Sequence, residues 1–152
     1  MMIFSISTEV LPEFKLLQDI CMYFERECEF DFDLPFTFKF LAHLAGDYAG
    51  DHCTKHGHHI IRIRVGRTLV ATVRTIFHEL YHALQAEGLG AQDFNMRYAE
   101  EKKSKAHDDI SFEKECNSIS RQLVQSYLST PQMIGHHYLS TFSRIVSEFN
   151  CQ

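Results

Sequence analysis

The chain has 152 residues, of which 45% are hydrophobic and 23% are charged. This length predicts a single domain over residues 1–152, large enough to bury a core without disulfides. The formal net charge of −5 argues against a nucleic-acid partner bound through general basicity. No apolar run approaches the roughly 18 residues that cross a bilayer, and the first residues lack the features of a secretion signal. The five cysteines form no CxxC pair, so we expect a cytoplasmic protein with reduced thiols and no membrane partner.

The first half of the chain predicts one helix and several extended segments. Apolar residues at helical spacing indicate a helix from about residue 12 to residue 28. Alternating phenylalanines over residues 30–40 indicate extended chain, broken at Pro35, and we assign them to the core. A short strand is predicted over residues 45–50. After a polar hairpin loop, the alternation over residues 60–65 predicts a strand with one buried face.

The second half predicts mainly helices. Helical spacing begins at Thr68 and ends at the glycines 88 and 90, and residues 89–108 read as an exposed loop or a short surface helix. A second strong helix is predicted over about residues 111–129, and Pro131 fits the first turn of a final helix. The order predicts an α+β domain. Its short, mostly antiparallel sheet would pack on the helix that begins at Thr68, with further helices toward the C-terminus.

Histidine is the residue type that points to chemistry, because the chain contains ten of them. The segment HELYH, residues 78–82, is an HExxH motif on the strongest predicted helix. His78 and His82 project from the same face of a helix, so both imidazoles can bind one zinc ion at about 2.0–2.1 Å. Glu79 would then lie beside the ion, where its carboxylate can take a proton from zinc-bound water.

A catalytic zinc ion needs a third protein ligand, and the best source is the helix over residues 111–129. Glu113 and Glu115 are both candidates, but they point in different directions around that helix, so only one can bind the ion. We favour Glu113 and leave Glu115 open. Asn117 shares a helix face with Glu113 and is the candidate for orienting a histidine ligand.

Two segments together resemble the gluzincin-type zinc metallopeptidases. These segments are HELYHAL over residues 78–84 and EKECNSISRQL over residues 113–123. The resemblance is greatest to the ImmA/IrrE-like family, whose pattern is HExxH followed by E-x-E-A-N-x-F-A-x-x-L, and it covers about residues 45–125. The chain departs from this pattern at Cys116, Ile119 and Ser120, where the family has Ala, Phe and Ala.

The resemblance implies a small zincin-like domain that hydrolyses peptide bonds of a protein substrate. It implies zinc at His78, His82 and Glu113, with Glu79 as the base. Members of the family often act on a transcriptional repressor, so a regulatory protein is a possible substrate. The alternatives are a catalytically inactive zincin-like module that binds a protein partner, and a helical interaction domain without metal.

Other parts of the proposed reaction stay open at the level of sequence. The strand over residues 60–65 is a candidate edge that pairs with an extended substrate. The tetrahedral intermediate needs a further hydrogen-bond donor, and the candidates are Tyr98, His136, His137 and Tyr138. The histidine-rich stretch over residues 51–59 matches no established zinc spacing, so we favour a polar loop over a second metal site. Cys116 is expected to be a buried apolar residue.

Overall fold

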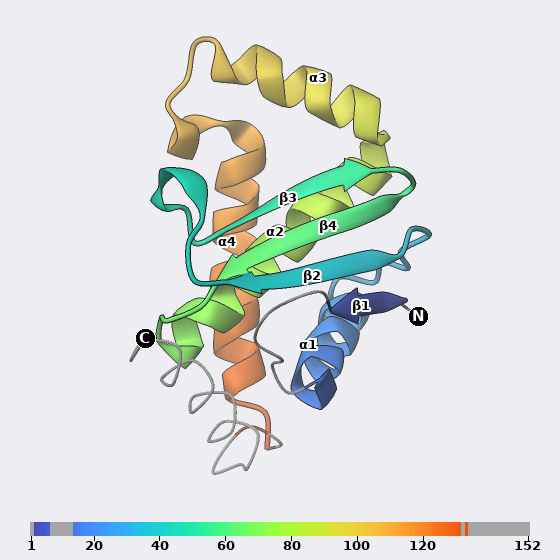
Figure 1. The fold of residues 1–152 in the computed structure, drawn as a ribbon, viewed down its shortest axis with the longest axis vertical. Helices are drawn as coiled ribbons and strands as arrows, with labels where there is room; N and C mark the ends of the chain where they lie inside the picture. Colours follow the sequence, from blue (N-terminus) through green and yellow to red (C-terminus); the bar gives the residue numbers. More distant parts are fainter. Residues whose placement is uncertain (1, 7–13, 132, 134–152) are drawn as a thin grey trace.

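The computed structural model describes residues 2–6, 14–131 and 133, and these form an α+β fold (Figure 1). In chain order its elements are β1 (Phe4–Ile6), α1 (Phe14–Glu27), β2 (Phe36–Leu41), the 3-10 turn η1 (Ala45–Asp47), β3 (Gly50–Lys55), β4 (His58–Arg64), α2 (Leu69–Leu89), α3 (Ala91–Lys102), the 3-10 turn η2 (His107–Asp109) and α4 (Ser111–Leu128). The predicted helices over residues 12–28, 68–90 and 111–129 therefore correspond to α1, α2 and α4 within their described parts. The predicted final helix after Pro131 lies outside the described residues.

The sheet has four strands in the order β1-β2-β4-β3. β1 pairs with β2 and β2 pairs with β4 in parallel, whereas β3 and β4 are antiparallel. The prediction of a mostly antiparallel sheet is therefore wrong. The prediction missed β1, a three-residue strand too short to show a pattern, and it missed that β2 pairs with β4 and not with β3, the next strand in sequence. The connection through α1 is the long crossover that parallel pairing of β1 and β2 requires.

Two further predictions about the extended segments are corrected. Residues 45–49 do not form a strand, because Gly46 and Asp47 have φ angles of 75° and 56°, which turn the chain into η1, and only Gly50 of the predicted segment belongs to a strand, β3. The polar stretch 51–59 is mostly strand, and only His56 and Gly57 form the turn between β3 and β4. Both turn residues have positive φ, as the tight two-residue hairpin requires. β4 lies inside the sheet, so the edge strand on this side is β3 and not residues 60–65.

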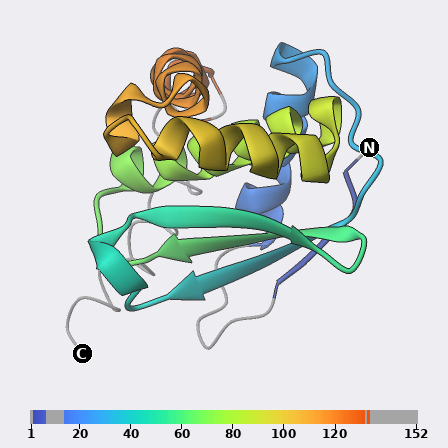
Figure 2. The same ribbon diagram turned by 90° about the horizontal axis from the view of Figure 1, so that it is seen from above.

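The described helices gather on one face of the sheet (Figure 2). The side chains of Ile61 and Ile63 are fully buried, whereas the intervening Arg62 is exposed and binds Asp51 on the neighbouring strand. The alternating phenylalanines of β2 are also buried, which confirms that they belong to the core. No described helix is long and apolar enough to cross a membrane.

An aromatic cluster joins α1, α2 and α4. The rings of Tyr23, Phe77 and Tyr127 contact one another with centroids 5.0–6.0 Å apart. The hydroxyl of Tyr127 donates to Asp19 Oδ2 at 2.7 Å, which ties the end of α4 to α1. These contacts set the position of α4 beside α1 and α2.

Replacing Tyr127 with phenylalanine should lower the free energy of unfolding by about 1–2 kcal/mol, because the carboxylate of Asp19 loses a hydrogen bond in a partly buried position. Urea denaturation followed by circular dichroism measures the change. Asp19→Asn keeps an oxygen acceptor and should cost less. Equal stability of wild type and Tyr127→Phe would show that the hydroxyl contributes nothing to the docking of α4.

Candidate metal centre

Helix α2 brings the HExxH residues to the middle of the molecule. The helix begins after Thr68, whose side-chain oxygen accepts a hydrogen bond from the backbone N–H of Ala71 at 3.2 Å. One face of the helix enters the apolar core through fully buried residues such as Phe77 and Leu80. His78 and His82 lie one turn apart beside that face, with ring centroids 4.8 Å apart.

Helix α4 brings Glu113 to the same place. The residues of α4 that are buried recur every three or four positions and form one stripe: Glu113, Cys116, Ser120, Leu123, Val124 and Tyr127. This spacing places all of them on the face that packs against α2. Glu113 is the first member of the stripe, so the packing that buries the apolar members also carries its carboxylate to the histidines.

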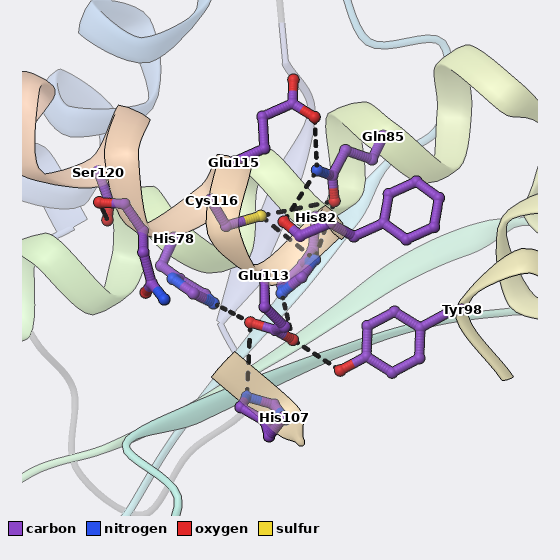
Figure 3. A network of polar contacts seen from close by, with 11 residues as sticks. His78, His82, Gln85, Tyr98, His107, Glu113, Glu115, Cys116 and Ser120 are labelled. Carbon is purple, nitrogen blue, oxygen red and sulfur yellow. Dashed lines mark hydrogen bonds and ion pairs between the residues drawn. The ribbon is translucent and has the colours of Figure 1, made fainter. Parts of the chain in front are cut away.

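The carboxylate of Glu113 bridges the two imidazoles (Figure 3). His78 Nε2 lies 3.0 Å from Glu113 Oε2, and His82 Nε2 lies 3.1 Å from Glu113 Oε1. A tetrahedral zinc site with bonds of about 2.0–2.1 Å separates its donor atoms by about 3.3 Å. Each histidine nitrogen therefore already lies near this spacing from one oxygen of the carboxylate, and nitrogen and oxygen donors suit zinc.

The electrostatics of the site favour a negative Glu113 carboxylate beside a positive or metal-bound His82 ring. Burial acts to raise the pKa of Glu113, but the hydrogen bonds from His78 and His82 outweigh it and hold this pKa well below its usual value. Burial acts to lower the pKa of His82, but the hydrogen bond to Glu113 and the charge of Glu79 raise it instead. A cation between the rings would replace the protons that these nitrogens now share with the carboxylate.

Two neighbours of Glu113, Glu115 and Cys116, also carry atoms that can bind a metal. The Glu115 carboxylate lies away from the imidazoles, where it accepts hydrogen bonds from the Tyr81 hydroxyl at 2.6 Å and the Gln85 amide at 3.4 Å. Cys116 is closer. Its Sγ and one ring nitrogen of each histidine lie within 4.8 Å of one another, a trio that could also hold a metal.

The position of Cys116 makes it the weaker candidate. The Cys116 Sγ lies 3.3 Å from Nδ1 of His82, on the side of the ring opposite to Nε2 and Glu113. Burial raises the pKa of the Cys116 thiol, which disfavours the thiolate that binds metals. The thiol is fully buried, as expected for a small apolar residue.

Gln85 orients the His82 ring, whereas the sequence predicted that Asn117 would orient a histidine ligand. Gln85 Oε1 lies 3.0 Å from His82 Nδ1, and the Gln85 amide donates to the backbone carbonyl of Phe112 at 3.1 Å. This arrangement links α2 to α4 and turns His82 Nε2 toward Glu113. Asn117 lines the same cavity. Gln85 lies three residues after His82, so helical spacing alone could have identified it.

Glu79 is held between α2 and the edge strand β3. Its side chain is buried, and this burial outweighs the lowering effect of His82 and raises the pKa of Glu79 to about 8. The charges of Glu113 and Asp51 also act to raise this pKa. Gly50 makes this packing possible. A Cβ atom at Gly50 would lie 3.2 Å from Glu79 Cγ and only 2.7 Å from the Thr75 methyl group.

Replacing Gly50 with alanine should push β3 away from α2, because the added carbon would also meet the backbone oxygen of Arg62 at 3.0 Å. We expect a loss of about 1–3 kcal/mol in the free energy of unfolding, measured by urea denaturation. Gly88→Ala is the matched control. Space around Gly88 is open and the residue is helical, so this change should stabilise the protein by about 1 kcal/mol. Similar effects of the two substitutions would contradict the close approach at Gly50.

Two residues on other elements also approach Glu113. The Tyr98 hydroxyl on α3 donates to Glu113 Oε1 at 2.7 Å, so this candidate transition-state donor contacts the carboxylate in the structure. His107 in η2 lies with Nε2 3.5 Å from Glu113 Oε2, and the sequence analysis missed it because no helical or strand period includes it. The other candidate donors, His136, His137 and Tyr138, lie outside the described residues.

A cavity of about 710 Å³ opens beside these residues. His78, Glu79, His82 and Glu113 all line it, and its walls are formed by β3, α2, α3 and α4. The proposed metal-binding residues and the start of the edge strand β3 therefore line the same cavity. Such a concave space with converging polar groups is typical of an active or binding site.

The histidine-rich stretch forms a polar cluster next to this cavity. His59 is fully buried, with Nε2 2.8 Å from Glu87 Oε2 and Nδ1 3.0 Å from His52 Nε2. Burial, followed by the neighbouring His59 and His82, lowers the pKa of His52 to about 3. Among the described residues, this cluster does not bring three ligand atoms close enough to one another to hold a metal ion. The cluster therefore ties the β3–β4 hairpin to the end of α2.

Comparisons with known proteins add no relative. No protein-family model matches the chain, and neither a curated protein nor a solved structure matches it. The function of the chain is therefore inferred from the geometry of the site.

Proposed function

We propose that this chain is a zinc-dependent metallopeptidase with a zincin-like fold that hydrolyses peptide bonds of a protein substrate. His78, His82 and Glu113 would bind the ion, and Glu79 would act as the base. The observation that supports the proposal best is the Glu113 carboxylate, which lies 3.0 and 3.1 Å from the two Nε2 atoms at the wall of an open cavity.

When bound, zinc would lower the pKa of a water molecule and polarise the substrate carbonyl. Glu79 would accept a proton from this water as its oxygen bonds to the carbonyl carbon, and would donate the proton to the amine as the C–N bond breaks. Burial raises the pKa of the Glu79 carboxyl to about 8, which favours its protonated form, whereas a bound cation favours the carboxylate. The same residue can therefore hold or release a proton near neutral pH.

The edge strand β3 would bind the substrate backbone. It forms one edge of the sheet, and its residues Gly50, Asp51 and His52 line the cavity. An extended peptide that pairs with β3 would lie across the metal centre through main-chain hydrogen bonds. This mode of recognition suits a protein substrate, including a regulatory protein of the cytoplasm. The described cysteines are all free, as a reducing compartment favours.

The inactive binding module remains the second candidate, and one observation favours it. His107 lies close enough to Glu113 to become a fourth protein ligand after a small movement. A four-ligand zinc site is closed and structural, whereas a catalytic site keeps one position open. If His107→Ala lowers zinc affinity as strongly as a ligand substitution does, the site is closed and the peptidase proposal is contradicted.

The main test uses untagged protein. We expect about one zinc ion per chain by elemental analysis, and cleavage of a complex peptide mixture, followed by mass spectrometry, that requires both zinc and Glu79. Stoichiometric zinc without cleavage would favour the inactive module. Absence of stoichiometric zinc would eliminate both readings.

A further inference from the structure

Two arginines line the cavity beside the candidate metal centre. Arg74 lies one helical turn before His78, and Arg67 lies just before α2 begins. Arg67 Nη1 donates to Thr75 Oγ1 at 2.9 Å, and Thr75 lies one turn before Glu79. The arginines therefore occupy the part of the cavity about one turn, or roughly 5 Å, from the HExxH residues, toward the start of α2.

No carboxylate in the described part of the chain neutralises the positive charge of these arginines. Among the described residues, no carboxylate forms an ion pair with Arg67 or Arg74, whereas Arg62 binds Asp51 through two nitrogens. Burial, followed by the neighbouring Arg64 and Arg74, lowers the pKa of Arg67. Positive charge concentrated in this way within an acidic chain is suited to an anionic group of a ligand.

The direction of β3 decides which end of a peptide would reach the arginines. Gly50, at the start of β3, packs against Thr75 and Glu79, whereas the other end of the hairpin binds Glu87 through His59. β3 and α2 thus run in the same direction. A peptide paired antiparallel with β3 would place its C-terminal residues beside Gly50 and Thr75, and Arg67 binds Thr75.

We propose that Arg67 and Arg74 bind a carboxylate of the substrate one or two residues after the scissile bond. This inference rests on the proposed peptidase function and adds a substrate class to it. The carboxylate is either the C-terminus of the peptide or the side chain of an aspartate or glutamate. In both cases the planar guanidinium groups supply paired N–H donors that match the two carboxylate oxygens.

The test measures binding of four peptide hydroxamates to zinc-loaded protein by calorimetry. In each probe the hydroxamate replaces the scissile carbonyl and a two-residue tail continues toward the C-terminus. The tails are Ala-Ala amide, Ala-Ala with a free carboxylate, Asp-Ala amide and Ala-Asp amide. The last three carry the carboxylate in different positions, so the tightest of them identifies its source.

We expect at least one carboxylate probe to bind about tenfold or more tightly than the neutral probe, as for a charge-assisted hydrogen bond. This advantage should disappear in Arg67→Gln/Arg74→Gln, while the neutral probe binds as before. Arg67→Lys/Arg74→Lys should retain part of it. The exposed Arg121 on α4 gives the matched control, because Arg121→Gln removes one charge away from the cavity.

Equal affinity of the four probes for the wild type would overturn the inference and leave the peptidase proposal standing, and so would an advantage that survives in the double variant. If zinc-loaded protein binds no probe, the proposed function itself fails, and this inference with it. Arg74→Gln keeps the hydrogen bond between Arg67 and Thr75, so it provides a folded variant if the double substitution destabilises the protein.

Discussion

Replacing Glu113 with glutamine should lower zinc affinity by about 100-fold or more, measured by competition with a chromophoric chelator on untagged protein. Loss of a group that only orients a ligand typically costs 10–100-fold, so loss of a ligand should cost at least as much. The glutamine keeps the shape of the side chain in the α2–α4 interface. It removes the negative charge that lies 3.0 and 3.1 Å from the two imidazole nitrogens.

Two variants next to Glu113 make this experiment specific. Glu115→Gln removes the same charge two residues away, where the carboxylate binds Tyr81, and should leave zinc affinity within a few-fold. Cys116→Ala removes the competing sulfur and should also have a small effect. A large loss in Cys116→Ala with little change in Glu113→Gln would identify Cys116 as the third ligand. A large loss only in Glu115→Gln would reverse the assignment of the two glutamates.

Glu79→Gln should abolish peptide cleavage and leave zinc binding intact. Removal of a general base typically costs a factor of about 10²–10⁴ in rate, which would bring cleavage to the limit of detection by mass spectrometry. Zinc content should stay near one ion per chain because Glu79 is not a proposed ligand. Cleavage at the wild-type rate would remove Glu79 from the role of base.

The same substitution should stabilise the metal-free protein in a pH-dependent way. Burial raises the pKa of Glu79 from its usual 4.5 to about 8 in the folded state, so the folded protein binds more protons than the unfolded chain between these values. Its contribution to stability is fully present below about pH 4.5 and is lost as the pH rises through 8. Glutamine does not titrate. The stability advantage of Glu79→Gln should therefore grow between pH 5 and pH 8 in urea denaturation, and an equal difference at both pH values would contradict it.

The helices could be predicted from sequence because their evidence is local. The apolar spacing of α2 and the cap at Thr68 lie within a few residues of one another, and the same holds for the stripe of α4. The strands were harder. β1 has only three residues, and its pairing with β2 depends on a partner more than thirty positions away. β3 was missed because its residues are mostly polar and show no apolar alternation, and its pairing with β4 and its packing against α2 are not visible in the local sequence.

The residues of the site also differ in how far the sequence could predict them. His78, Glu79 and His82 lie on one helix, so the HExxH spacing was enough to name them as candidates. Glu113 lies on the buried stripe of a second helix, where the sequence favoured it but left Glu115 open. Gln85 could also have been predicted, because it lies three residues after His82 on the same helix. His107 was not, because the 3-10 turn that carries it has no period and its position depends on how α3 returns toward α4.

The shared stripe of α4 has a thermodynamic consequence. Glu113 and Tyr127 belong to one packed face of α4. An ion bound at Glu113, in the first turn, would therefore also stabilise the packing of the last turn against α2 and α1. At a free zinc concentration 100 times the dissociation constant, this linkage would add about 2.7 kcal/mol to the folded state. Reciprocity makes the reverse hold as well. A substitution that creates a void near the far end of α4, more than three turns from the histidines, would therefore lower the affinity for zinc.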